Sequence, residues 1–173
     1  MVSCDSPAVS VLIVREAVEG DLEEVGRISV EAYVAAGQLE QGVGNGYERV
    51  LSDAGARYRE ALLLVAVRGD DLVGTVTICP TGSRFSEIGG PGEVEFRFLA
   101  VRPSAWGSGV GTALIQACHD YARDVGATRL AICVRDTNAG AMSMYLKRGF
   151  ARLPERDFQP VPGVDLLALH KDL

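Results

Sequence analysis

The N-terminal part of the chain predicts one strand and two helices. Residues 10–15 alternate between apolar and polar side chains, as a half-buried strand does. The next segment repeats its apolar residues at helical spacing, at Leu22, Val25, Ile28 and Ala32. Residues 37–46 hold four glycines, too many for a helix interior. We therefore expect a loop there and a second helix over residues 47–59.

The middle of the chain predicts a hairpin followed by a longer strand. Residues 61–68 and 72–80 are two apolar runs, and the Gly-Asp-Asp sequence between them is typical of a tight turn. Residues 81–92 are expected to form a loop. The Val and Phe content of residues 93–101 then predicts a third strand in this region.

A glycine-rich turn follows this strand. Residues 101–112 read VRPSAWGSGVGT, and the apolar residues after them repeat at helical spacing as far as Gly126. Glycine lets the backbone approach a ligand closely, and the first turn of a helix offers unpaired N–H groups at the positive end of its dipole. The turn is therefore suited to bind phosphate without a lysine.

Two common nucleotide-binding motifs differ from this turn. A Walker A loop requires Gly-Lys-Ser/Thr, which is absent here. In a dinucleotide fingerprint the first glycine follows the strand directly, whereas five residues intervene here and Thr112 occupies the position of the last glycine. Asp136 stands at about the distance expected of the ribose-binding acid, which keeps an unrelated nucleotide-binding domain open as an alternative.

A second motif lies after another predicted strand, residues 130–134. Residues 137–150 read TNAGAMSMYLKRGF, in which Thr137 can cap a helix and Gly149 can end it. Asn138 and Tyr145 stand seven positions apart and therefore share one helix face. Beyond this helix, the apolar runs 151–153 and 164–169 predict two closing strands.

Together, the two motifs resemble those of the GNAT superfamily, the acyl-CoA-dependent N-acetyltransferases. The first is similar to that family's RxxGxG/A at a helix start, and the second to its NxxAxxxYxxxGF. Trp106 departs from the pattern, because the family usually has Gln or Arg there. The order β-α-α-β-β-β-α-β-α-β-β extends the resemblance over almost the whole chain.

The resemblance implies an α/β (α+β) fold in a single N-acetyltransferase domain over residues 1–173, with residues 1–9 flexible. Its central sheet would be mixed and mostly antiparallel, flanked by helices. Two parallel strands, residues 93–101 and 130–134, would splay apart and admit the cofactor between them. By the same resemblance this cofactor is acetyl-CoA. The residues implied in binding it are Leu99, Ala100, Val101, Trp106, Gly107, Ser108, Gly109, Val110, Gly111, Thr112 and Asn138.

Two catalytic candidates follow, Tyr145 and Glu95. The resemblance places Tyr145 beside the thioester sulfur, where its hydroxyl can donate partially to the leaving thiolate. Glu95 lies on the strand where several family members place a base. A base matters most for a lysine-like amine, whose deprotonation at pH 7 costs about 4.6 kcal/mol, against about 1 kcal/mol for an α-amine. Alternatives stay open: a water chain as the base, Glu95 as a solvent-facing charge paired with Arg97, and Tyr145 as a half-buried aromatic covering the core.

Composition narrows the class of protein. The chain has 173 residues, 47% of them hydrophobic, which fits one globular domain, and its apolar runs are far shorter than the roughly 20 residues of a membrane span. A formal charge of −6 argues against nucleic-acid binding. His119 and His170 lack partners at metal-binding spacing, so we expect no metal. The scattered cysteines and the absence of a leader-like N-terminus predict reduced thiols and a cytoplasmic location.

The sequence therefore predicts an enzyme that transfers an acetyl group from acetyl-CoA to a primary amine by direct attack in a ternary complex. The acceptor is left open between a small molecule and a peptide amine, as are the acyl-chain preference and a homodimeric state. A non-catalytic module of the same fold that binds or senses acyl-CoA is the main alternative.

Overall fold

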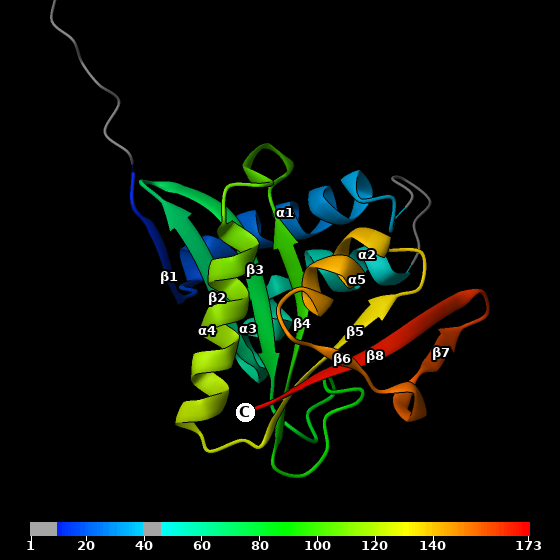
Figure 1. Cartoon of the computed structure of the whole chain (residues 1–173). Helices are drawn as coiled ribbons and strands as arrows, with labels where there is room; N and C mark the ends of the chain where they lie inside the picture. The colour runs from blue at the N-terminus through cyan, green and yellow to red at the C-terminus, as the bar shows by residue number, and fades with distance from the viewer. Residues whose placement is uncertain (1–9, 40–45) are drawn as a thin grey trace, which may run out of the picture.

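The computed structural model describes residues 10–39 and 46–173. Residues 1–9, which were predicted to be flexible, and most of the predicted 37–46 loop lie outside the described residues. The described chain folds into a central sheet with helices on both faces (Figure 1). None of its helices has the length and apolarity needed to cross a lipid bilayer.

The sheet has the strand order β1-β2-β3-β4-β5-β8-β6, with β7 paired to β8. Among these pairs only β4 and β5 run parallel; the others are antiparallel. The strands are β1 (Leu12–Glu16), β2 (Leu62–Arg68), β3 (Asp71–Cys79), β4 (Glu93–Val101), β5 (Arg129–Arg135), β6 (Ala151–Arg152), β7 (Phe158–Val161) and β8 (Val164–Asp172). The predicted mixed and mostly antiparallel sheet is thus confirmed.

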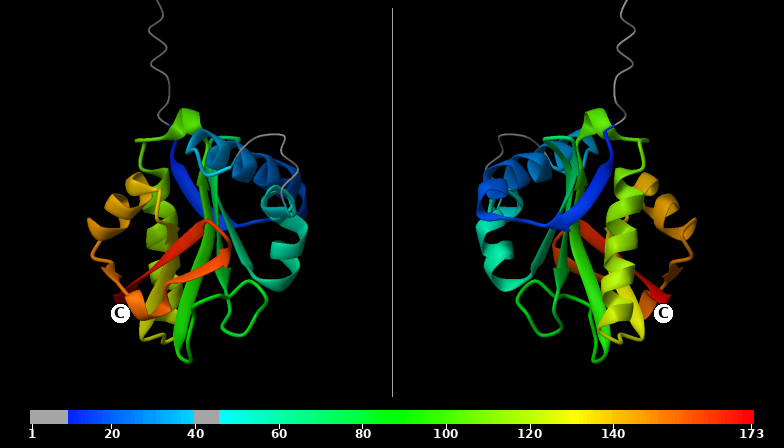
Figure 2. Two further views of the ribbon diagram at one scale, coloured as in Figure 1. Left: turned by 90° about the vertical axis from the view of Figure 1, so that its right-hand side faces the viewer. Right: turned by 90° about the vertical axis from the view of Figure 1, so that its left-hand side faces the viewer.

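Helices cover the two faces of the sheet unequally (Figure 2). The helices are α1 (Leu22–Ala35), α2 (Gly46–Ser52), α3 (Ala54–Glu60), α4 (Val110–Asp124) and α5 (Ala139–Leu146). The first three lie on one face, and α4 and α5 lie on the other. The buried face of α4 carries Leu114, Ile115 and Cys118, which pack with Phe96 of β4 in the larger core cluster. Burial of this apolar stripe explains why α4 docks flat on the sheet.

The structure differs from the predicted elements at two places, for local reasons. The single helix expected over residues 47–59 is divided into α2 and α3, because Asp53 ends the first and caps the second by accepting the N–H of Ala56 at 2.9 Å. Strand β7 was not predicted. Its Pro160 is unusual within a strand, but β7 pairs only with β8, in a hairpin that turns at Gly163 with φ +81°.

Strand β4 contains a bulge that changes which side chains face which helices. Phe98 has a positive φ of +55°, and the register with β3 shifts at this point. Before the bulge, Phe96 packs on the α4–α5 side of the sheet. After it, Phe98 and Ala100 pack with residues of α1 on the opposite side. Arg97 and Phe98 are therefore neighbours on one face, and the Arg97 guanidinium lies 4.7 Å from the Phe98 ring centre.

Strands β4 and β5 pair over only part of their length. The paired residues are Glu93 to Glu95 on β4 and Arg129 to Ala131 on β5. Beyond them β4 continues to Val101 beside β3, while β5 continues to Arg135 beside β8. The two strands diverge towards the loop that follows β4, as Figure 1 shows. The splayed parallel pair that the resemblance implied is therefore present.

Candidate active site

The glycine turn, residues 106–111, leaves the first turn of α4 accessible. Gly109 is the N-cap residue of α4 with φ +87°, and no side chain caps this helix end. Gly107 also has a positive φ, of +74°, and a Cβ at either position would meet no atom within 4 Å. The backbone conformation thus requires glycine, and the N–H groups at the helix start are free to bind an anion.

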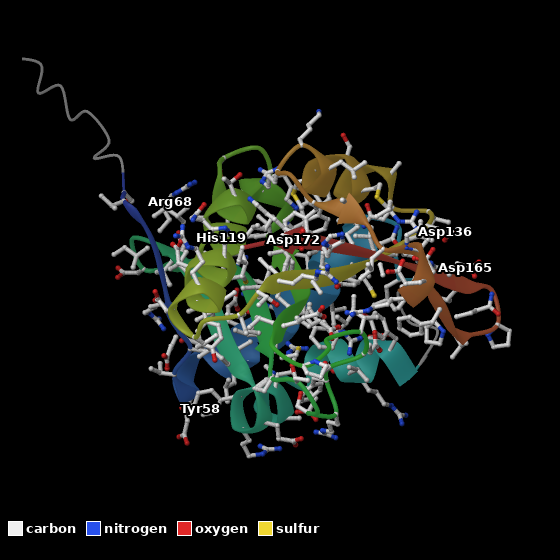
Figure 3. The ribbon with its side chains drawn as sticks, turned by 60° about the horizontal axis from the view of Figure 1, so that its bottom comes forward. Tyr58, Arg68, His119, Asp136, Asp165 and Asp172 are labelled. Atoms are coloured by element: carbon white, nitrogen blue, oxygen red, sulfur yellow. The ribbon has the colours of Figure 1, made fainter. Side chains whose placement is uncertain are left out.

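Side chains from other elements hold the glycine turn in place. Arg68, at the end of β2 (Figure 3), donates to the Ser108 hydroxyl at 3.2 Å and to its carbonyl at 3.1 Å. The Trp106 indole N–H donates to the carbonyl of Val101 at 2.8 Å, although half of the residue is exposed. Trp106 therefore links the turn to the end of β4. Sequence reasoning missed Arg68, because this arginine stands 40 positions before Ser108 in the chain.

Positive charge near the turn comes from Arg68 and Arg148. Arg148 donates to the hydroxyl of Thr112, in the first turn of α4. Arg102 is engaged elsewhere, in an ion pair with Glu24. A cavity of about 130 Å³ opens beside Arg148 along α4, and His119 (Figure 3) and Lys171 also line it. Positive charge is thus present beside the turn although the formal net charge of the chain is −6.

Helix α5 holds both polar residues of the second motif. Asn138, rather than Thr137, is its N-cap residue, because the Asn138 side-chain oxygen accepts the N–H of Ala141 at 3.1 Å. The predicted cap at Thr137 is thus wrong by one residue. Gly149, with φ +83°, follows the end of the helix as predicted. The amide nitrogen of Asn138 is not used in the cap and remains available to a ligand.

Tyr145 lies between two aromatic side chains, with ring centres 5.9 Å from Phe96 and 5.5 Å from Phe150. It is 3% exposed and belongs to the core, so it is buried more deeply than the half-buried position of the alternative. Its hydroxyl nevertheless has no hydrogen-bond partner among the described residues. Burial raises the pKa of this hydroxyl far above its usual value, so at neutral pH the group keeps its proton and can donate a hydrogen bond.

The end of β4 presents a free edge beside this tyrosine. Leu99 and Val101 are half-buried on the α4–α5 side, and Ala100 is buried on the other side. Because β5 has diverged here, the backbone groups of residues 99–101 that point towards β5 lack a strand partner. An extended molecule with amide groups can pair with such an edge as an added strand does. The pantetheine arm of acetyl-CoA has this chemistry, so the residues present fit the cofactor that the sequence implied.

Glu95 lies on the opposite face of β4 and is completely buried. Its Oε2 atom accepts four hydrogen bonds, from the Ser86 hydroxyl at 2.9 Å and from the N–H groups of Glu87, Ile88 and Gly89 at 2.8 to 3.0 Å. Its Oε1 atom is buried without a hydrogen-bond partner among the described residues. The alternative that Glu95 is a solvent-facing charge is therefore wrong, because the β3–β4 loop folds over it.

Glu95 and Arg97 are joined by three polar side chains that sequence reasoning did not single out, those of Glu87, Tyr33 and Tyr47. The Arg97 guanidinium lies 2.9 Å from Glu87 Oε1 and 4.0 Å from Glu95 Oε1. The rings of Tyr33 (α1) and Tyr47 (α2) lie 6.0 Å apart. Tyr33, Tyr47, Glu87, Glu95 and Arg97 are called the polar face below. No spacing in the sequence links them, since they come from two helices, a loop and a strand.

Charges couple these groups across the sheet. Burial raises the pKa of Glu87, the charge on Arg97 opposes this, and the charge on Glu95 adds to it. Burial also raises the pKa of Tyr33, and proximity to Tyr47 and then to Tyr145 raises it further. Tyr33 therefore stays protonated at neutral pH.

Metal ligands and reactive thiols are not found among the described residues. No group of three or more His, Cys, Asp or Glu side chains in residues 10–39 and 46–173 could hold a metal ion. Cys79, Cys118 and Cys133 carry free thiols. Burial raises the pKa of Cys79 and of Cys133 to about 12, so neither is a ready nucleophile.

Comparison with known proteins agrees with this geometry. Residues 31–150 match the profile of the Acetyltransferase (GNAT) family. N-acetyltransferase 8B of Rattus norvegicus is 31% identical over 102 residues; the alignment covers 59% of this chain but only 42% of that relative. The chain thus matches less than half the length of this curated relative.

Two solved structures share the fold over nearly the whole chain. The PaiA N-acetyltransferase of Thermoplasma acidophilum, solved in complex with coenzyme A, has a TM-score of 0.76 at 17% identity, with 94% of this chain and 99% of that chain covered. A GCN5-related N-acetyltransferase of Kribbella flavida has a TM-score of 0.67 at 27% identity, with 97% and 100% covered.

Proposed function

Because the chain belongs to the GNAT family of acetyltransferases, we propose that it is an enzyme that transfers an acetyl group from acetyl-CoA to a primary amine. The amine attacks directly, in a ternary complex. The proposal treats residues 1–173 as one N-acetyltransferase domain. It also includes a cytoplasmic site of action, which the free thiols of the described cysteines support.

The divergence of β4 and β5 is the observation that supports this proposal most directly. It exposes unpaired backbone at residues 99–101 directly before the glycine turn, and the turn offers the free N–H groups at the start of α4. One continuous segment thus joins an edge suited to an amide-containing arm with a site suited to phosphate. Tyr145, with its unpartnered hydroxyl, packs against Phe96 of the same strand.

In the proposed mechanism, acetyl-CoA supplies the acetyl group as a thioester, and the chain binds and orients it. The glycine turn and the first turn of α4 hold the phosphates, with Arg68 nearby as a positive charge. Residues 99–101 pair with the arm, and a backbone N–H of this edge polarises the carbonyl oxygen. The Asn138 amide nitrogen contacts the arm or a phosphate.

Tyr145 assists departure of the sulfur. Its hydroxyl stays protonated at neutral pH because burial raises its pKa. A tyrosine of still higher pKa than usual transfers its proton to a thiolate less readily, so we propose that Tyr145 donates a hydrogen bond rather than the whole proton. The second catalytic candidate, Glu95, remains a prediction, and only its Oε1 atom is left for it, because Oε2 is fully engaged.

Thermal stability with and without ligands tests the proposal first. Acetyl-CoA and CoA, at about 100 times Kd, should each add roughly 2.7 kcal/mol to the free energy of unfolding, whereas NAD and ATP should add nothing comparable. Acetyl-CoA with an amine should then release free thiol. Stabilisation by CoA without thiol release for any amine would favour the non-catalytic binding module, and no stabilisation by acetyl-CoA would refute the proposal.

A further inference from the structure

We propose that Glu87 is the base that removes the proton from the acceptor, that Glu95 is a positioning residue that holds Glu87 in place, and that the acceptor is a primary amine that is cationic at neutral pH. This inference rests on the proposed acetyl transfer and deepens it. The geometry of the β3–β4 loop carries it.

Glu95 is built into the loop rather than presented to a ligand. Three successive backbone N–H groups, of residues 87–89, converge on its Oε2 atom together with the Ser86 hydroxyl. Such a cradle of N–H groups is a strong fixed partner for one carboxylate oxygen. Because the side chain is 0% exposed and one of these donors is the N–H of Glu87 itself, Glu95 fixes where the Glu87 side chain begins.

The Glu87 side chain is accessible to a ligand, unlike that of Glu95. One quarter of its side chain is exposed. Its Oε1 atom is held by Arg97 at 2.9 Å, while its Oε2 atom has no hydrogen-bond partner among the described residues. One oxygen is thus oriented by a cation and the other is open to an incoming group. Burial raises the pKa of this carboxyl group towards the neutral range in which a general base is most effective.

The groups around Glu87 suit a cationic amine. Arg97 and Glu95 of β4 face it, and its charge also acts on Tyr47 of α2, Cys79 of β3 and Cys133 of β5. Aromatic faces attract alkylammonium ions, and a carboxylate binds them directly. Tyr47, which is 39% exposed on the same polar face, would supply the aromatic partner for such an ion.

Tyr33 of α1 completes the aromatic part of the polar face, with its ring 6.0 Å from that of Tyr47. Helix α1 packs on the side of the sheet to which Phe98 and Ala100 turn after the bulge. In the proposed complex, an amine bound at Glu87 therefore approaches the open edge at residues 99–101 from the α1 side of β4.

The proton balance of the proposed step is complete. The ammonium N–H bond breaks, its electron pair stays on nitrogen, and the proton forms an O–H bond with Glu87 Oε2. The neutral amine uses this pair to attack the carbonyl carbon, and the C–S bond breaks with its electron pair on sulfur. The second proton of the attacking nitrogen is transferred to this sulfur, so the products are a neutral amide and a free thiol. Glu87 returns its proton to solvent, to which one quarter of the side chain is open.

The variants Glu87→Gln, Glu95→Gln and the control Glu60→Gln test this inference, Glu60 being a partly exposed glutamate paired with Arg84. The probes are benzylamine, a cation at pH 7, and methoxyamine, which is neutral there. Glu87→Gln should lower kcat/KM for benzylamine by about 10²- to 10³-fold and leave methoxyamine nearly unchanged. Glu60→Gln should match the wild type with both.

The pH profile separates the two carboxylates. Wild-type turnover of benzylamine should show an acidic limb set by Glu87, lost as pH falls below the raised pKa of this group. Glu87→Gln should abolish the limb, so that the rate simply rises with the fraction of free amine. Glu95→Gln should keep the limb and move it to lower pH, because a neighbouring negative charge is removed. Loss of the limb in Glu95→Gln alone would instead identify Glu95 as the base and overturn the inference.

A binding measurement does not depend on turnover. In the presence of CoA, benzylamine should raise the thermal stability of the wild type and of Glu60→Gln, but not that of Glu87→Gln. CoA alone should stabilise all three equally. If CoA stabilises none of them, the proposed function fails. If CoA stabilises them but benzylamine adds nothing to the wild type, or adds as much to Glu87→Gln, only the present inference fails.

Discussion

The glycine turn and the polar face are built in opposite ways on the two ends of β4. The turn uses contiguous residues, positive-φ glycines and backbone N–H groups, and it leaves open space where side chains would be. The polar face uses side chains from four separate elements around a buried carboxylate. A ligand common to many proteins can be held by backbone alone, whereas a particular acceptor requires particular side chains.

Removal of the buried carboxylate should break the polar face most severely. Glu95→Ala leaves the Ser86 hydroxyl and three backbone N–H groups without their partner, so we expect a loss of about 3–5 kcal/mol in the free energy of unfolding. Urea denaturation measures it. The matched variant Glu60→Ala removes a partly exposed ion pair and should cost no more than about 1 kcal/mol. Equal losses in the two variants would show that the loop does not depend on Glu95.

The junction between the two regions is tested by Tyr145→Phe. Turnover should fall by about 10²-fold, the lower end of the range for proton donors, because the leaving sulfur loses its hydrogen bond. Stability and CoA binding should hardly change, since the hydroxyl has no partner among the described residues. Steady-state kinetics and a CoA thermal shift provide both readouts. A stable variant with unchanged turnover would remove Tyr145 from the mechanism.

A substitution at Gly109 tests the glycine turn rather than the polar face. Gly109→Ala forces a side chain into φ +87°, which costs about 1–2 kcal/mol, and it should also weaken the stabilisation by CoA. Gly20→Ala is the control, because that glycine has open space and no positive φ. Thermal denaturation with and without CoA compares the two. If the control loses as much CoA stabilisation as Gly109→Ala, the turn is not the phosphate site.

The smallest effect is expected at Trp106. Trp106→Phe keeps an aromatic ring but loses the 2.8 Å hydrogen bond to the Val101 carbonyl, at a cost of about 0.5–1.5 kcal/mol. Circular dichroism during denaturation measures this. In the wild type, the fluorescence of Trp106, the single tryptophan, should change when CoA binds the turn. No fluorescence change under saturating CoA would place the ligand away from Trp106.

Much of the fold was predictable from the sequence because its elements carry strong local signals. The hairpin of β2 and β3 follows from two apolar runs and a Gly-Asp-Asp turn, and α4 from a long amphipathic stripe between two glycines. The division at Asp53 was not predicted, because an aspartate within a helical pattern reveals its capping role only through the N–H that it accepts.

The candidate site was predictable only where it is local. The glycine turn is contiguous, so its residues identify it without knowledge of the fold. Arg68 joins it across 40 positions, a relation that no spacing encodes. For Glu95, the sequence left a solvent-facing charge open as an alternative to a base, because the β3–β4 loop that covers this residue has no periodic pattern. Hydrogen bonds from residues six to nine positions earlier in the chain, rather than the preferences of the strand itself, decide its surroundings.

The bulge at Phe98 changes which residues of β4 face each side of the sheet. Upstream of it, odd-numbered residues such as Glu95 face α1; downstream, even-numbered residues such as Ala100 do. Deletion of one residue at this point would restore regular alternation along the whole of β4. The last residues of the strand would then move to the opposite faces, so that Leu99 and Val101 exchange sides with Ala100. Within homologues of this chain, insertions and deletions should therefore be rare at this one position of the strand.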